Sequence, residues 1–88
     1  MAFATNAVVK VTPNAIATYT TTVPAAGVFC QLIILTAGTV SFTITFGTGF
    51  KSTGTLATGV TAARVFVLNW ISDGINLYEA GRTAAMVA

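Results

Sequence analysis

The sequence contains no histidine, only two acidic residues and a single cysteine. Without histidine, the chain lacks the commonest general base and the commonest metal ligand. We expect the two carboxylates, Asp73 and Glu79, to lie too far apart along a strand to act on one bond. Cys30 cannot form an internal disulfide, and its apolar neighbours predict a buried, inert thiol. These absences argue against an enzyme, and we expect neither a cofactor nor a metal.

Charge is also scarce. Charged residues make up 7% of the chain and hydrophobic residues 55%, with a mean hydropathy of +0.83. A soluble surface usually carries roughly 25–35% charged residues. Lys10, Lys51, Arg64 and Arg82 are scattered along the chain, whereas nucleic-acid binding needs clustered cations. We therefore expect no nucleic-acid partner, and a surface that other subunits or a larger assembly largely cover.

The hydrophobic residues are not arranged as a membrane span. Polar residues and glycines interrupt the uncharged stretch between Val11 and Phe50, and its densest apolar piece is VFCQLIIL. A spanning helix needs roughly 20 apolar residues. The first residues, MAFATNAVVK, lack the basic start and long apolar core of a signal peptide. We expect no membrane partner, so assembly explains the hydrophobicity better.

The hydrophobic pattern predicts strands. Residues 40–46 alternate strictly between apolar and hydroxyl side chains, which predicts a strand with one buried face. Residues 28–35 are apolar on both faces, as in a more central strand. Ala37 and Gly38 between them predict a two-residue hairpin turn that pairs Leu35 with Val40 on the core face.

Further short strands follow from the same pattern. Residues 7–11 and 16–23 read as edge strands because prolines mark their ends, 55–57 as a short strand and 64–71 as a long apolar strand. We therefore predict an all-β fold, a small antiparallel β-sandwich or jelly-roll-like barrel with an extended N-terminal arm. The predicted division is residues 1–12 as arm or edge strand, 13–83 as the β domain and 84–88 as a C-terminal tail.

The stretch WISDGINLYE, residues 70–79, predicts a hairpin that turns at Asp73 and Gly74. In a two-residue turn Trp70 faces Leu77, on the core face. Asn69, Asn76 and Tyr78 then lie on the opposite face. Arg82 either pairs with a carboxylate such as Glu79 or is a solvated charge at the rim.

Residues 28–83 resemble a small β module of tailed-bacteriophage virion proteins, in which a Gly/Thr-rich loop and an apolar strand lead into an S-D-G hairpin. Leu77-Tyr78 replaces the Asn-Trp pair that is more usual in that module. The matching residues are Gly38, Phe50, Lys51, Gly54 to Gly59, Phe66, Ser72, Asp73, Gly74, Tyr78, Glu79 and Arg82. In a chain with little beyond the module, the resemblance implies a capsid decoration (cement) protein.

Such a protein binds the phage head surface and stabilises it by bridging capsid subunits. The expected partners are the major capsid protein and further copies of the chain in a homotrimer. The expected location is the virion head surface, after assembly in the host cytoplasm. We expect apolar arm contacts from Phe3, Val8, Val9 and Val11, and polar contacts from Lys10, Lys51, Arg64 and Arg82.

Two other functions remain open. A tail-fibre or spike module would bind a host receptor or glycan through Asn69, Asn76 and Tyr78. A barrel-type binder of single-stranded nucleic acid is the third possibility, and salt-dependent binding to oligonucleotides would reveal it.

Overall fold

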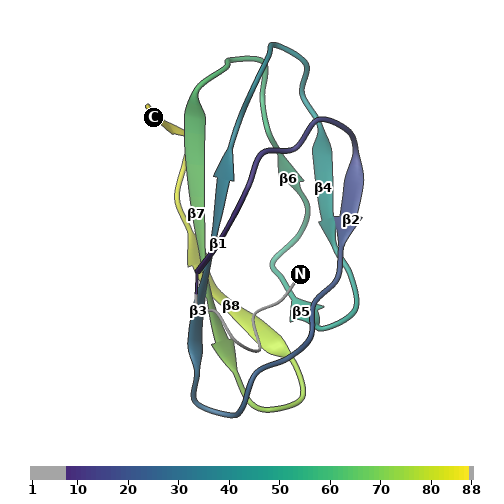
Figure 1. Cartoon of the computed structure of the whole chain (residues 1–88), viewed down its shortest axis with the longest axis vertical. Helices are drawn as coiled ribbons and strands as arrows, with labels where there is room; N and C mark the ends of the chain where they lie inside the picture. The colour runs from purple at the N-terminus through teal and green to yellow at the C-terminus, as the bar shows by residue number, and fades with distance from the viewer. Residues whose placement is uncertain (1–7, 88) are drawn as a thin grey trace.

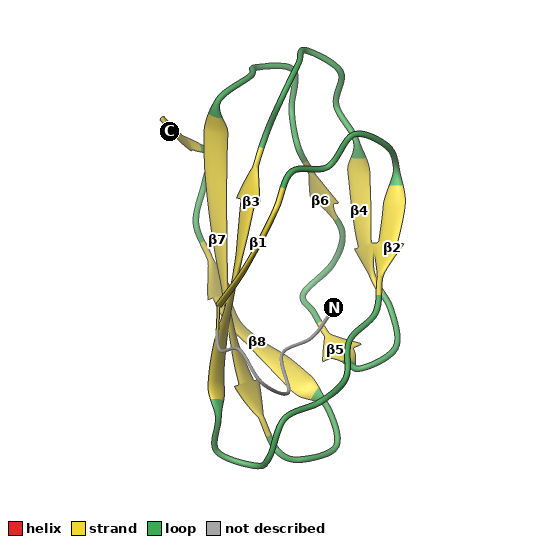
Figure 2. Ribbon diagram, in the orientation of Figure 1, coloured by secondary structure: helices red, strands yellow, loops and turns green. Residues whose placement is uncertain are grey.

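The computed structural model describes residues 8–87, and these form nine strands and no helix (Figure 2). The predicted all-β class is confirmed. Most predicted strands are present, with ends that differ by a few residues. The strands are β1 (Val8–Val11), β2 (Ala17–Tyr19), β3 (Phe29–Leu35), β4 (Thr43–Phe46), β5 (Phe50–Lys51), β6 (Leu56–Ala57), β7 (Arg64–Ser72), β8 (Leu77–Arg82) and β9 (Met86–Val87).

The strands form two sheets that lie opposite one another (Figure 1). The larger sheet has the order β1-β3-β7-β8-β5, with β9 also paired to β7, and the smaller has the order β2-β4-β6. β1–β3, β2–β4 and β5–β8 pair in parallel, so the predicted all-antiparallel arrangement is wrong. β1 and β3 are parallel because the chain between them passes through β2 in the other sheet, so no hairpin joins these two strands.

The core lies between the two sheets. Alternate residues of β3 and β7 point inward, and Leu32, Ile34, Leu68 and Trp70 have no exposed surface. Burying a large apolar side chain stabilises the fold by about 1.5–3 kcal/mol. The inward position predicted for Trp70 is confirmed. Its ring packs at 5.2 Å from Phe46 and 4.8 Å from Phe50, measured between ring centroids.

The hairpin predicted at Ala37 and Gly38 is wrong. β3 pairs with β7 over seven residues, placing Leu35 opposite Val65, whereas β4 belongs to the other sheet. The turn therefore crosses between sheets, and Val40 is 63% exposed instead of facing the core. β7 occupies one edge of β3 and β1 occupies the other, which leaves no edge of β3 for β4.

The hairpin between β7 and β8 is confirmed, but its predicted register is wrong. Its loop has four residues because the Asp73 carboxylate accepts hydrogen bonds from the backbone N–H groups of Ile75 and Asn76, both at 2.8 Å. Trp70 therefore lies opposite Glu79, and Ser72 lies opposite Leu77. A slip of two residues keeps each side chain on its predicted face, so Trp70 still points inward.

A tight turn between β4 and β5 connects the sheets. The Gly49 carbonyl accepts a hydrogen bond from Leu77 at 2.8 Å, and the Thr48 carbonyl accepts one from Thr21 at 3.1 Å. Gly49 has a φ of 93°, and a Cβ atom there would lie 2.6 Å from the Thr21 carbonyl oxygen. This position requires glycine for both its backbone conformation and its close packing.

We predict that Gly49→Ala destabilises the protein much more than Gly38→Ala. Gly38 has a φ of 77° but open space around its Cα, so its substitution adds only conformational strain of about 1–2 kcal/mol. Gly49→Ala adds a backbone clash to that strain. Urea denaturation of both variants measures the difference, and equal losses would show that the turn is not packed as described.

Candidate binding surfaces

The predicted arm contacts divide between the two faces of β1. Val8 and Lys10 are exposed on the outer face of the larger sheet, whereas Val9 and Val11 are half-buried against the core. β1 pairs in parallel with β3 of the same chain. Val9 and Val11 thus contribute to the fold of their own subunit. Phe3 lies outside the described residues.

The predicted cationic contacts lie at separate places in the larger sheet. Arg64 is the first residue of β7. Lys51 lies near the other end of that strand, because it pairs with Tyr78 and Tyr78 pairs with Ile71. Arg82 lies opposite Leu68, near the middle of β7. The structure does not gather these cations into one patch.

Arg82 forms an ion pair with Glu79 inside the molecule. Two nitrogens of its guanidinium, Nε and Nη2, donate to the two carboxylate oxygens at 2.8 and 2.7 Å. The Glu79 side chain is 2% exposed and that of Arg82 is 23% exposed. Of the two alternatives for Arg82, a partner for Glu79 is therefore confirmed.

A β-bulge brings these two side chains to the same face. In a regular strand, residues three apart point to opposite faces. Here Asn69 lies opposite Gly81 and Trp70 lies opposite Glu79, which leaves Ala80 as an extra residue in β8. The extra residue turns both Glu79 and Arg82 toward the interior.

The ion pair also binds the loop between β5 and β6. Arg82 donates to the carbonyl oxygens of Gly54 and Thr55, both at 3.0 Å. The N–H and hydroxyl of Thr53 each donate to Glu79 at 3.2 Å. Hydrogen bonds from Arg82, together with its charge, lower the pKa of Glu79, although burial opposes the shift. All these contacts serve the chain's own loop, which indicates a structural role.

Of the other side chains that could react, Cys30 is buried and Asp73 is hydrogen-bonded in a turn. Cys30 is buried, as predicted, and burial raises the pKa of its thiol, which disfavours the reactive thiolate. Hydrogen bonds from the Asn76 and Ile75 N–H groups lower the pKa of Asp73 at the exposed turn.

Within residues 8–87, no group of three or more His, Cys, Asp or Glu side chains gathers as a metal site. Over the same range, no helix has the length and apolar character to cross a membrane.

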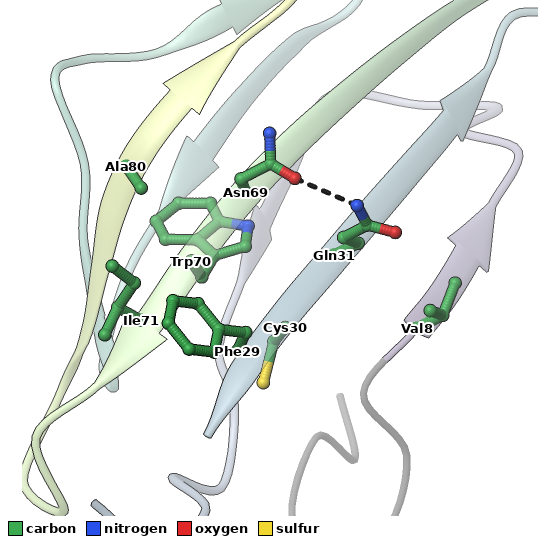
Figure 3. Close-up of a pocket in the computed structure, with 8 residues that line it drawn as sticks. All are labelled: Val8, Phe29, Cys30, Gln31, Asn69, Trp70, Ile71 and Ala80. Carbon is green, nitrogen blue, oxygen red and sulfur yellow. Dashed lines mark hydrogen bonds between the residues drawn. The ribbon is translucent and has the colours of Figure 1, made fainter. Parts of the chain in front are cut away.

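A groove of about 290 Å³ crosses the outer face of the larger sheet. Asn69 lines it, and Tyr78 lies on the same face beside Ile71, whereas Asn76 is in the turn. Sequence reasoning missed Phe29 and Gln31, which line the groove from β3 (Figure 3). Alternation along β3 places them on one face, but only the unpredicted pairing with β7 brings them to Asn69.

A second surface lies at one end of the long axis, where the chain passes between sheets (Figure 1). We call residues 37–42 and 59–63 the loop end; residues 12–16 lie toward the same end of the molecule. None of these segments contains a charged residue. Each exposes one large aliphatic side chain: Ile16 at 74%, Val40 at 63% and Val60 at 67%.

Hydrogen bonds hold the loop end together. The Thr58 N–H donates to the Phe42 carbonyl at 2.9 Å, and the Thr58 hydroxyl accepts from the Phe42 N–H at 2.8 Å. The Gly59 N–H donates to the Ser41 hydroxyl at 3.1 Å. The loop end is therefore an ordered, uncharged surface, on which Val40 and Val60 are exposed among the hydroxyl side chains of Thr39, Ser41 and Thr61.

We predict that Glu79→Ala lowers the free energy of unfolding by about 2–3 kcal/mol, because it leaves Arg82 without its partner inside the molecule. Asp73→Ala removes the only other acidic side chain, which accepts two hydrogen bonds at an exposed turn, and we expect a smaller loss of about 1 kcal/mol. Urea denaturation at neutral pH measures both. A similar loss in the two variants would contradict the structural role of the ion pair.

The lowered pKa of Glu79 also predicts a pH dependence. The ionised carboxylate of Glu79 stabilises the fold fully at any pH above the ordinary carboxyl pKa of about 4.3. This stabilisation is lost as the pH falls through the lower pKa that Glu79 has in the folded protein. Glu79→Gln should therefore lose less stability than the unmodified protein on acidification below about pH 4.3. Thermal unfolding over this range measures the difference, and parallel pH curves would refute it.

Comparisons of the chain with protein-family models, with curated proteins and with solved structures find no match.

Proposed function

We propose that the protein is a structural component of a bacteriophage particle, a decoration protein that binds the head surface and bridges capsid subunits. We interpret its two facing sheets as a small β-sandwich. The observation that carries the proposal is the loop end, an uncharged surface with exposed valines that hydrogen bonds hold in place. The sequence resemblance to phage virion modules supports the same function.

The loop end has the properties of a protein-binding surface. Depletion of charged residues distinguishes the centre of interfaces from the rest of a protein surface. The hydrogen bonds of Thr58 and Gly59 fix the loops in advance, so binding loses less conformational entropy than with mobile loops. A single exposed apolar residue is normal on a protein surface and does not indicate a binding site. Here, however, Val40 and Val60 are both exposed on neighbouring loops that contain no charge.

Two strand edges supply the proposed bridging contacts. β1 is the last strand of the larger sheet, and β2 is the last strand of the smaller sheet, as predicted. The outer side of an edge strand has backbone donors and acceptors that can pair with another chain. We propose the major capsid protein and further copies of this chain, in a homotrimer, as the partners at these edges. The proposed location is the virion head.

We predict that Val40→Asp and Val60→Asp each prevent binding to purified, undecorated phage heads. Each substitution places a charge in the apolar contact, where desolvation is unfavourable. Co-sedimentation of the protein with heads measures the binding. Ile75→Asp is the matched control, because Ile75 is 75% exposed in the turn between β7 and β8, at the opposite end of the molecule.

Heads should therefore retain the Ile75→Asp variant and lose the two loop-end variants. Equal binding of all three variants would show that the loop end is not the attachment surface. Binding of the unmodified protein to tails and not to heads would favour the tail-fibre alternative.

A further inference from the structure

The groove on the outer face of the larger sheet combines an apolar lining with two amide side chains. Residues of β1, β3, β7 and β8 line it, and none of them is charged. Phe29, Gln31, Asn69 and Ile71 are the central ones (Figure 3). Its volume of about 290 Å³ is at the lower end of the range for small-ligand sites, which are mostly apolar with a few placed polar groups.

The two amides are oriented by a mutual hydrogen bond. The Gln31 side-chain nitrogen donates to the Asn69 side-chain oxygen at 3.1 Å, across the β3–β7 ladder (Figure 3). This bond leaves the Asn69 nitrogen as a free donor and the Gln31 oxygen as a free acceptor among the described residues. The groove thus presents one donor and one acceptor whose positions depend on each other.

Phe29 adds an aromatic surface beside these amides. Its side chain is 69% exposed, although it belongs to a strand whose alternate residues are fully buried. Ile71, directly opposite in the ladder, is 39% exposed. Phe29 and Ile71 are therefore neighbours on the outer face of β3 and β7, where they provide an apolar surface for the C–H groups of a ligand.

We propose that this groove binds a neutral saccharide of one or two sugar units. A sugar hydroxyl both donates and accepts, so a pair of hydroxyls matches the free donor of Asn69 and the free acceptor of Gln31. The apolar face of a sugar ring packs against Phe29. The uncharged lining offers no counter-ion to an anionic or cationic ligand. The groove lies on a sheet face and not at the loop end, so this inference is independent of capsid attachment.

The test titrates the ¹⁵N-labelled protein with glucose, galactose, N-acetylglucosamine, lactose and maltose, and follows backbone amide shifts by NMR. At least one of these sugars should shift the amides of residues 29–31 and 69–71, with a Kd in the millimolar range. Phe29→Ala and Gln31→Met should each weaken that binding about tenfold, since each removes a contact worth roughly one hydrogen bond.

Val60→Ala is the matched control, because it removes a similarly exposed apolar side chain at the loop end. Its affinity for the same sugar should equal that of the unmodified protein. The absence of shifts at the groove with all five sugars would overturn the proposal. Unchanged affinity in both groove variants would also overturn it, as would equal weakening by Val60→Ala.

Discussion

The ion pair between Glu79 and Arg82 links the two sheets through the loop that joins them. It is the one ion pair among the described residues, and it binds the Gly/Thr-rich loop between β5 and β6. That loop connects Phe50 and Leu56, which belong to the core and to different sheets. Because the loop has few apolar side chains of its own, polar contacts to Glu79 and Arg82 fix its path. The pair thereby helps to hold the two sheets together.

Both acidic side chains are engaged in contacts within the chain. Glu79 satisfies Arg82, and Asp73 is occupied in the turn, so both acidic side chains serve the fold. The loop end and the outer groove contain no charged residues, and both remain accessible in the single chain. An ordered, uncharged surface such as the loop end is suited to assembly, which connects the scarcity of charge in the sequence to the proposed structural function.

Much of the fold follows from local patterns in the sequence. Alternation predicted β4, and continuous apolar runs predicted β3 and β7. Trp70 was placed in the core because the two-residue period of a strand fixes the face of each side chain. Pairing across long sequence distances was not predictable in this way, so β4 was assigned to the wrong sheet. The bulge at Ala80 was hidden as well, since its local cue is only the glycine at position 81, whose φ is 156°. The groove was missed for the same reason, because Gln31 and Asn69 meet only through the β3–β7 ladder.

We propose that this chain attaches to a phage head through its loop end. A cryo-electron microscopy map of the virion at side-chain resolution would show where the chain binds. We predict density for the chain on the outer head surface, with Val40 and Val60 against the capsid and with β1 or β2 beside a neighbouring chain. Density for the chain only in the tail, or a loop end that faces solvent on the head, would contradict the account.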